Sequence, residues 1–354
     1  MAAKTTSITQ FRCKKCNAPY PLGADDVIAT CPYCGFTFKI GGKEIKHLII
    51  PNKLDKKSVK AAVKKWLKFA ASKSVGGGIV KHIELEEPIL QWIPIFRVKG
   101  QFESSHFGVK KEGSGDSARH IKIEDRDSGE FTEYVIARRH AATFGIDEFI
   151  LSLDDGGAKN FEIDITDGAP VLNSEIDDAD ASKRAHKSRM DRDRVELLDK
   201  VDKLLDHRLN LTPETSTYTH SPYWLVRFTY QKGTFRVAVS GATGKILLGE
   251  LPVTKRYRIK KWFSSIFLLI GSGLLFQILP YFVVVLASGS SSDGDAWMIP
   301  VFIALAAGLL WVASITVIGG ALRYEVEVDT EGKERGDRFS FTETMKQLGG
   351  KAIG

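Results

Sequence analysis

Residues 263–286 read FSSIFLLIGSGLLFQILPYFVVVL and residues 298–322 read MIPVFIALAAGLLWVASITVIGGAL, and neither run contains a charged side chain. A helix needs about 20 apolar residues to cross the roughly 30 Å hydrocarbon core of a bilayer, so each run is long enough. A short polar segment, 287–297, separates them. We therefore predict a two-helix transmembrane hairpin over 263–322. The alternative, two buried core helices of a soluble domain, is disfavoured because such long helices normally keep a polar stripe.

The charges that flank the hairpin predict its orientation. The connecting segment contains no Lys or Arg, and Arg323 directly follows the second run. Because positively charged flanks stay on the cytoplasmic side, we expect a two-pass protein of the cell (inner) membrane with both termini in the cytoplasm. The basic residues that precede the first run are Lys255, Arg256, Arg258, Lys260 and Lys261.

The composition of the whole chain excludes a polytopic membrane protein and a fully disordered one. Of 354 residues, 43% are hydrophobic and 26% are charged, and the formal net charge is +7. This mild positive balance does not by itself indicate a nucleic-acid partner. All four cysteines lie within the first 34 residues, which leaves none for disulfides elsewhere and fits a reducing compartment. The polar residues 1–10 do not have the pattern of a signal peptide.

The cysteines form two C-x-x-C pairs separated by 14 residues, Cys13/Cys16 and Cys31/Cys34. Two such pairs predict a zinc ribbon, because each pair makes a tight turn whose two thiolates reach one ion at about 2.3 Å. Four protein ligands leave no open position, so we expect one structural Zn²⁺. A module this small seldom folds without such a metal. Free or redox-active cysteines and a four-thiolate iron site are the alternatives.

Other residues near the cysteines support this interpretation. Gly35 follows the second pair, where a left-handed backbone costs glycine nothing. Three lysines, Lys14, Lys15 and Lys39, should add positive potential that favours thiolate over thiol. Zinc ribbons bind nucleic acid or protein, or only cap a neighbouring domain, and the residues leave all three roles open.

The segment that follows is strongly basic, with a net charge of +8 over 43–73. Apolar residues recur at helical spacing from Asp55 to Ala71, with Asp55 or Ser58 as the N-cap, and the Gly76–Gly78 run ends the region as a loop. The opposite face could contact lipid headgroups or nucleic-acid phosphates, or could simply be solvated. Its lysines are Lys56, Lys57, Lys60, Lys64, Lys65 and Lys68.

An acidic segment, 147–180, carries a net charge of −10. It does not match a calcium-binding loop, so a solvated loop, a cation site or a partner for the basic helix remain open. A long helix is expected next, over 180–209, from apolar residues at helical spacing. Two similar runs, 92–100 and 222–230, predict strands, and 235–245 predicts a hairpin with a glycine-rich turn.

These segments give an α+β fold class: an N-terminal zinc ribbon, a mixed α/β cytoplasmic domain and a C-terminal two-helix transmembrane hairpin. The expected boundaries are 1–42 for the zinc ribbon, 43–78 for the basic amphipathic helix and linker, 79–254 for the cytoplasmic domain with its long helix near 182–209, 263–322 for the hairpin, and 323–354 for a cytoplasmic tail.

The cysteine pattern resembles the TFIIB-type ribbon. Residues 221–286, with Val237-Ala-Val-Ser-Gly-Ala-Thr-Gly-Lys245 and the basic run into the apolar helices, resemble TFIIB-type zinc-ribbon membrane proteins of bacteria and archaea. Members are often labelled primosomal helicase-like, but this chain has no helicase motor motif. Some relatives are linked to phage-shock membrane assemblies, so the resemblance implies an adaptor and suggests a role in envelope stress.

No pattern in the sequence indicates an enzyme. The eight histidines are scattered, and neither an H-E-x-x-H motif nor a G-x-S-x-G elbow is present. No small-molecule substrate is evident. We expect a membrane-anchored cytoplasmic adaptor or scaffold that contacts membrane lipids and recruits protein partners. The alternative is a membrane-tethered nucleic-acid-binding or regulatory protein.

Overall fold

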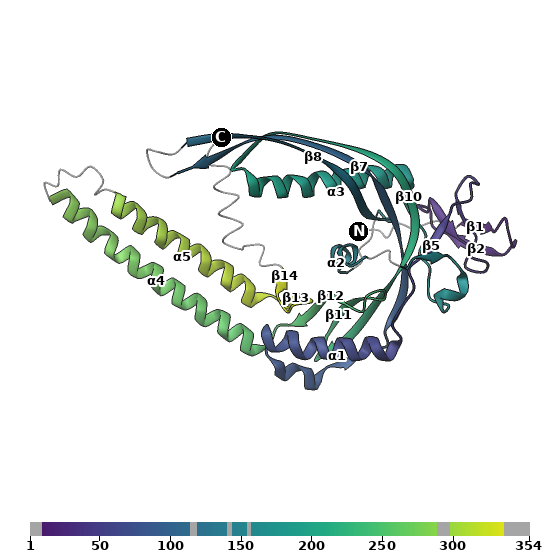
Figure 1. Cartoon of the computed structure of the whole chain (residues 1–354). Helices are drawn as coiled ribbons and strands as arrows, with labels where there is room; N and C mark the ends of the chain where they lie inside the picture. Colours follow the sequence, from purple (N-terminus) through teal and green to yellow (C-terminus); the bar gives the residue numbers. More distant parts are fainter. Residues whose placement is uncertain (1–8, 114–118, 140–143, 154–156, 289–297, 336–354) are drawn as a thin grey trace.

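The computed structural model describes residues 9–113, 119–139, 144–153, 157–288 and 298–335. It confirms the α+β fold class: a small N-terminal cysteine module, a strongly curved antiparallel sheet with packed helices, and a C-terminal pair of long apolar helices (Figure 1). The expected polar turn at 289–297 and most of the expected tail, 336–354, lie outside the described residues.

One long strand, β10 (Lys203–Tyr230), organises the sheet. Its first two thirds pair with β7 (Ile89–Glu112), from Lys203 opposite Val109 to Pro222 opposite Trp92, and β7 pairs with β8 (Arg119–Ile136). Its last third pairs with β11 (Gly233–Ser240), which is followed across the sheet by β12 (Ile246–Pro252). The two runs at 92–100 and 222–230 are therefore strands, and 235–245 lies in the β11–β12 hairpin, as the sequence predicts.

The sheet curves where β10 is irregular. Register shifts interrupt the β7 pairing at Leu204/Asp206 and at Pro213/Thr215. Gly100 lies opposite Pro213, and a Cβ at Gly100 would lie 2.1 Å from the carbonyl oxygen of Thr212. Bulges of this kind bend a strand, and only glycine permits so close a backbone approach. The three-stranded part of the sheet thus arches over α3 (Asp178–Lys200), which lies on its concave side (Figure 1).

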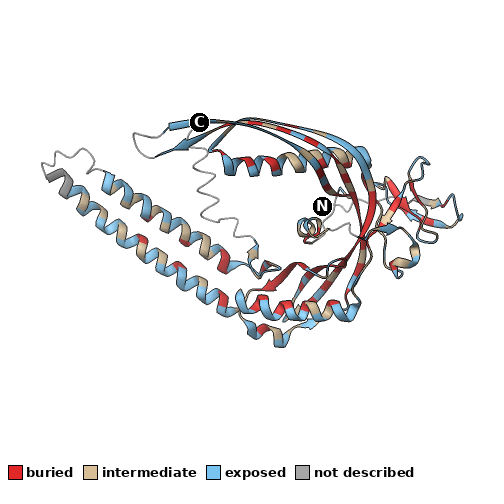
Figure 2. Cartoon of the chain, viewed as in Figure 1, coloured by how far each residue is buried: buried red, intermediate tan, exposed pale blue. Residues whose placement is uncertain are grey.

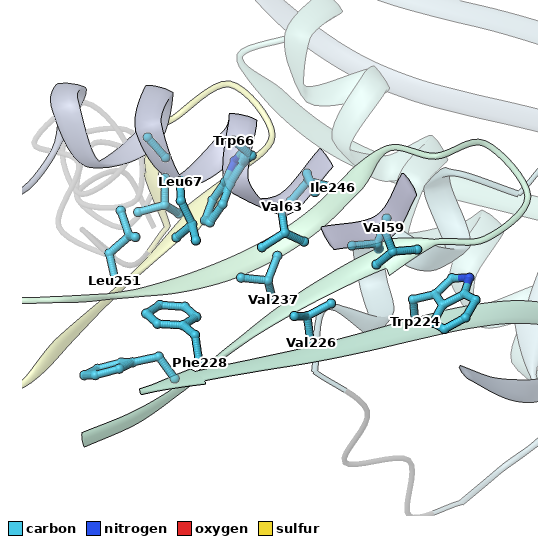
Figure 3. Packing of buried hydrophobic residues seen from close by; sticks show 14 of the residues in the cluster. Val59, Val63, Trp66, Leu67, Trp224, Val226, Phe228, Val237, Ile246 and Leu251 are labelled. Carbon is cyan, nitrogen blue, oxygen red and sulfur yellow. The ribbon is translucent and has the colours of Figure 1, made fainter. Parts of the chain in front are cut away.

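The basic segment forms α1 (Lys56–Lys73), which covers one face of the sheet near β12. The Asp55 side chain accepts a hydrogen bond from the Ser58 backbone N–H and caps the helix. Apolar side chains of α1 pack on β10, β11 and β12, and Figure 3 shows Val59, Val63, Trp66 and Leu67 facing the strands. A Cβ at Gly249 would lie 2.1 Å from the Trp66 ring, so the indole needs glycine beneath it. A short 3-10 helix, η1 (Gly77–His82), and β6 (Glu84–Leu85) follow.

The helix predicted for 180–209 extends too far at its C-terminal end. Helix α3 ends at Lys200, and residues 203–209 belong to β10. The apolar residues of 201–209 fit a helical spacing, but their backbone pairs with β7 instead, so long-range strand pairing overrides the local pattern. The helix itself is amphipathic only weakly and carries many charges.

The acidic segment is mostly irregular, with α2 (Ile146–Leu151), β9 (Lys159–Asn160) and a short 3-10 helix at Ile163–Thr166. Its carboxylates do not pair with α1 within the described residues. They pair instead with Lys39, Arg138, Arg139, Lys183 and Arg335. Among the described residues, the ion pairs therefore do not support the alternative in which this segment is a partner for the basic helix.

The two apolar helices are α4 (Lys255–Ser288) and α5 (Met298–Leu322). Both are long and apolar enough to cross a membrane. Only 6% of the most apolar 18-residue stretch of α4 is buried, and 11% of that of α5, so they are not core helices. Figure 2 shows both helices largely exposed. Apart from Tyr257, which packs on the sheet, their buried positions are small, and most of them recur at seven-residue spacing: Ser265 and Ser272 on α4, and Ala307, Ser314, Gly320 and Ala321 on α5.

Hydrogen bonds join the two helices along this line of small residues. The Ser265 and Ser314 hydroxyls lie 2.7 Å apart, and the Ser272 hydroxyl donates to the Ala307 carbonyl oxygen at 2.9 Å. Small residues that let helices approach, with hydroxyls between them and large apolar side chains outside, are the arrangement expected when the surroundings are lipid. Water would favour the reverse.

The chain returns to the sheet after α5. Strand β13 (Glu325–Asp329) pairs with β12, with Glu325 opposite Pro252, and β14 (Glu334–Arg335) pairs with β13. Val326 and Val328 complete the apolar core under α1. The boundaries 79–254 and 323–354 therefore need correction, because residues 325–335 belong to the sheet domain. Strand β5 (His47–Ile49) also belongs to the sheet domain, because it pairs in parallel with β10, although it lies in the expected linker 43–78.

This insertion predicts how the sheet domain tolerates shortening. Because Pro252 and Glu325 are opposite each other on adjacent antiparallel strands, Asn-Gly in place of residues 255–322 should close a tight turn and preserve the sheet. We expect this variant to stay soluble without detergent and to unfold cooperatively. Truncation after Thr254, which keeps all of β12, should aggregate, because it removes β13 from the core. Circular dichroism and gel filtration measure both, and equal behaviour of the two variants would contradict the assignment of β13.

Candidate metal centre

The four cysteines lie on two turns of the same backbone design. In the first, the Cys13 N–H donates to the Ala18 carbonyl and the Asn17 N–H donates to the Cys13 carbonyl. In the second, the Cys31 N–H donates to Phe36 and the Gly35 N–H donates to Cys31. Each turn ends in a left-handed residue, Asn17 at φ 60° and Gly35 at φ 72°. Gly35 has the conformation that the sequence predicts.

The two turns bring all four sulfur atoms together. The Sγ atoms of Cys13, Cys16, Cys31 and Cys34 lie within 4.8 Å of one another. The Cys13–Cys34 and Cys16–Cys31 sulfur pairs, each formed across the two turns, are both 3.7 Å apart. That distance is too long for a disulfide, whose sulfurs are about 2.05 Å apart. It matches the edge of about 3.8 Å of a tetrahedron of sulfurs placed about 2.3 Å from a central zinc ion.

The surroundings of the sulfurs are mostly apolar. Cys13 and Cys31 are buried, and Phe11, Tyr20 and Phe38 pack beneath them. The small strands β1 (Thr9–Arg12), β2 (Pro19–Leu22), β3 (Ile28–Thr30) and β4 (Thr37–Lys39) form two hairpins that carry these aromatic side chains. A four-sulfur cage over a small aromatic core is suited to holding an ion in place.

The thiols differ in acidity because of burial and backbone donors. Burial raises the pKa of Cys31 to about 12 and also raises the pKa of Cys34. Burial opposes ionisation of Cys13 too, but the N–H groups of Cys16 and Lys15 lower its pKa to about 7. A bound divalent cation would favour the thiolate form of all four. Lys39 does not contribute as predicted, since its ammonium pairs with Asp177 at 2.8 Å and with Asp178 at 3.5 Å.

The cysteine module is docked on the sheet domain. The Ile28 N–H donates to the Ser174 carbonyl and the Ser174 N–H donates back to Ile28, which forms an isolated bridge. The Thr30 N–H donates to the Asn173 side chain at 3.1 Å. Ile28 is buried with residues of the sheet, including Phe96 and Tyr218. Residues 173–178 of the acidic segment thus form the surface that the cysteine module contacts.

A buried chain of hydrogen bonds continues from the module into the sheet. Thr37 Oγ1 lies 2.7 Å from His47 Nδ1, His47 Nε2 lies 2.6 Å from His220 Nδ1, and His220 Nε2 lies 2.8 Å from the Leu172 carbonyl oxygen. A carbonyl only accepts, so His220 donates through Nε2. Two neutral rings then require His47 to donate through Nε2 and to accept from Thr37. Thr30 lies 3.0 Å from Thr37 and begins the chain.

This arrangement holds both imidazoles neutral. Burial, and then the neighbouring His220, put the pKa of His47 well below its usual value. Burial lowers the pKa of His220 to about 4, although its bond to the Leu172 carbonyl acts in the opposite direction. A proton on His220 Nδ1 would also set two N–H donors against each other between His47 and His220. The histidine pair was not singled out in the sequence, because its members are 173 residues apart.

The six lysines proposed to contact lipid or phosphate do lie on the face of α1 that points away from the sheet. Lys56, Lys57, Lys64, Lys65 and Lys68 are exposed, and Lys60 is partly buried. The Lys60 ammonium is hydrogen-bonded to the Glu87 carboxylate. None of the other five has an ion-pair partner among the residues that the structure describes. The structure therefore separates Lys60 from the rest.

Comparisons with protein-family models, with curated proteins and with solved structures found no match for this chain. The resemblance to TFIIB-type membrane proteins is supported only as far as the cysteine cluster and the two apolar helices.

Substitution Cys31→Ser tests the metal centre. Removal of one thiolate from a buried four-sulfur cage should reduce bound zinc from about one ion per chain to nearly none, and should expose residues 9–40 to protease. Tyr33→Ser is the matched control, because Tyr33 lies in the same turn with a side chain that is 63% exposed. Metal analysis and limited proteolysis measure the two effects. Full zinc content in Cys31→Ser would refute the site.

The histidine pair predicts a pH dependence of stability. The folded-state pKa of His220 is about 4, below an unfolded value of about 6.5, so the unfolded chain binds more protons in that range. Its contribution, about 3 kcal/mol, should be complete above pH 7 and lost progressively as the pH falls from about 6.5 to about 4.

Denaturant unfolding in detergent at several pH values measures this dependence, with released zinc recorded in parallel. The double variant His47→Gln/His220→Gln should be less stable at pH 7.5 and should show a shallower loss of stability towards pH 5 than the native chain. If the native chain and the double variant release equal amounts of zinc and lose equal stability between pH 7.5 and pH 5, the histidine pair is not the cause of the pH dependence.

Proposed function

We propose that this chain is a membrane-anchored adaptor whose zinc-folded head and sheet domain stand on the cytoplasmic side of the cell membrane. The observation that carries this proposal is the inverted character of the α4–α5 pair, with small and hydroxylated residues inside and large apolar residues outside. This contact pattern agrees with a lipid environment.

The connection of the helices to the sheet supports a two-pass topology. Helix α4 follows β12 and helix α5 precedes β13, and these strands are paired neighbours. If both helices cross the bilayer, everything else that the structure describes stands on one side of it. The basic residues at the start of α4, together with Arg323 after α5, favour the cytoplasmic side.

The four-sulfur cage supports a structural Zn²⁺ held by Cys13, Cys16, Cys31 and Cys34. Zinc would fold the module, and the module would then present a surface to a partner. Two large apolar side chains lie on its outside, Tyr33 at 63% and Ile40 at 44% exposure. Exposed aromatic and aliphatic residues on a small rigid module are typical of protein contact sites. This observation favours protein partners over a purely capping role.

A membrane-tethered nucleic-acid binder is the second candidate, and the unpaired lysines of α1 favour it. Phosphate contacts by lysine would make binding to DNA or RNA fall steeply as salt rises. An adaptor for protein partners predicts weak binding to nucleic acid with little sequence or salt dependence.

Cross-linking in membranes, followed by identification of the captured proteins, tests the adaptor proposal. We expect a defined partner set that is lost in Tyr33→Ser/Ile40→Ser, although this variant should keep its zinc. Leu151→Ser is a control, because Leu151 is 82% exposed on α2, outside the cysteine module. An unchanged partner set, together with tight and salt-sensitive binding of DNA or RNA by the full chain in detergent, would favour the nucleic-acid function instead.

A further inference from the structure

The end of α1 is fixed against the base of the apolar helix pair. The Thr254 hydroxyl, one residue before α4, donates to the Val75 carbonyl at 2.5 Å. Tyr257 in the first turn of α4 is buried in the same cluster as Ala70, Ala71 and Val75. The C-terminal end of α1 therefore lies beside the start of α4, whereas its N-terminal end lies away from it (Figure 1).

The strand that leaves the helix pair is braced against α1 as well. The Trp66 indole N–H donates to the Asp329 carbonyl at 3.0 Å, and the Lys73 ammonium donates to the Glu331 carbonyl at 3.0 Å. Both chain connections to the helix pair are thus in contact with the C-terminal half of α1. If α4 and α5 span the bilayer, this half of α1 is held close to the membrane surface.

The lysines of α1 divide into two groups along the helix. At the N-terminal end, Lys60 bonds to Glu87 and Lys56 also acts on the Glu87 carboxylate, whereas Lys57 is exposed and has no ion-pair partner among the described residues. At the C-terminal end, Lys64, Lys65 and Lys68 are exposed and have no ion-pair partner among the described residues. Lys73 is engaged with Glu331 and lies over the Phe69 ring, so it does not belong to the free group.

The first two turns of α4 are basic as well. Lys255, Arg256, Arg258 and Lys260 are exposed, and Phe69, 43% exposed, adds an aromatic side chain at the end of α1. A cluster of Lys and Arg directly beside a membrane helix attracts anionic headgroups, by about fivefold in binding for each residue near the surface. An aromatic side chain in such a cluster suits the headgroup region.

We propose that Lys64, Lys65 and Lys68, together with the basic start of α4, bind the headgroups of anionic phospholipids and hold α1 against the bilayer. This inference rests on the proposed membrane anchoring, and it assigns the lipid contact to only three of the seven lysines on α1. The contact would fix the orientation of the sheet domain and of its docked cysteine module relative to the membrane plane.

The test uses the full chain in nanodiscs of phosphatidylcholine alone and with about a third phosphatidylglycerol. Hydrogen exchange of the backbone amides of 64–73 should be at least about tenfold slower with the anionic lipid, and 0.5 M NaCl should remove most of the difference. Lys64→Gln/Lys65→Gln/Lys68→Gln should lose the effect. Lys53→Gln/Lys56→Gln/Lys57→Gln removes the same charge from exposed positions at the far end and should keep it.

Several results would overturn the inference. Equal exchange in the two lipid compositions would exclude a headgroup contact. Equal loss in both triple variants would show a diffuse charge effect without a site. Protection of 64–73 by an added oligonucleotide but not by anionic lipid would assign these lysines to nucleic acid. A chain that enters nanodiscs but lacks lipid preference contradicts this inference alone, whereas a chain that does not enter them contradicts the membrane anchoring as well.

Discussion

The pairing of β12 with β13 constrains the rest of the molecule. It places the start of α4 and the end of α5 at neighbouring points on one sheet, although 72 residues, 253–324, lie between the end of β12 and the start of β13. The helix pair is therefore an insertion into a sheet domain, with residues of the core on both sides of it. Such a long apolar insertion is physically favourable if its exposed surface faces lipid rather than water.

The cysteine module and the helix pair contact different parts of the same strand system. The module sits on residues 173–178 and connects through His47 to His220 in the middle of β10, while α1 joins β10, β12 and β13 to the base of α4. Metal binding by the module would therefore stabilise the region around residues 173–178 and His220. The helix pair contacts the other region, around α1, β12 and β13. The cysteine module and the base of the helix pair are thus connected through β10.

Features with a local signal could be predicted from the sequence. The cysteine spacing, the capped helix with its apolar stripe from Val59 to Ala70, and the apolar runs 263–286 and 298–322 all specify their structures through nearby residues. Asn17 could also have been recognised, because it occupies in the first cysteine turn the position that Gly35 occupies in the second. Asparagine is among the residues that tolerate a left-handed backbone.

Features that depend on distant pairing could not be predicted. Residues 201–209 satisfy a helical spacing, and only their hydrogen bonds to β7 make them a strand. Residues 325–329 look like the start of a polar tail, and only the partner β12 makes them part of the core. The contact between His47 and His220 likewise exists only because β5 pairs in parallel with β10. In each case the deciding interaction lies far away along the chain.

Alkaline carbonate extraction of membranes that contain the full chain tests the central claim most directly. Carbonate removes proteins held by surface charge and leaves those whose helices cross the hydrocarbon core. The account predicts that the chain stays in the membrane pellet, from which only detergent releases it. Recovery of the chain in the supernatant would show that α4 and α5 do not span the bilayer.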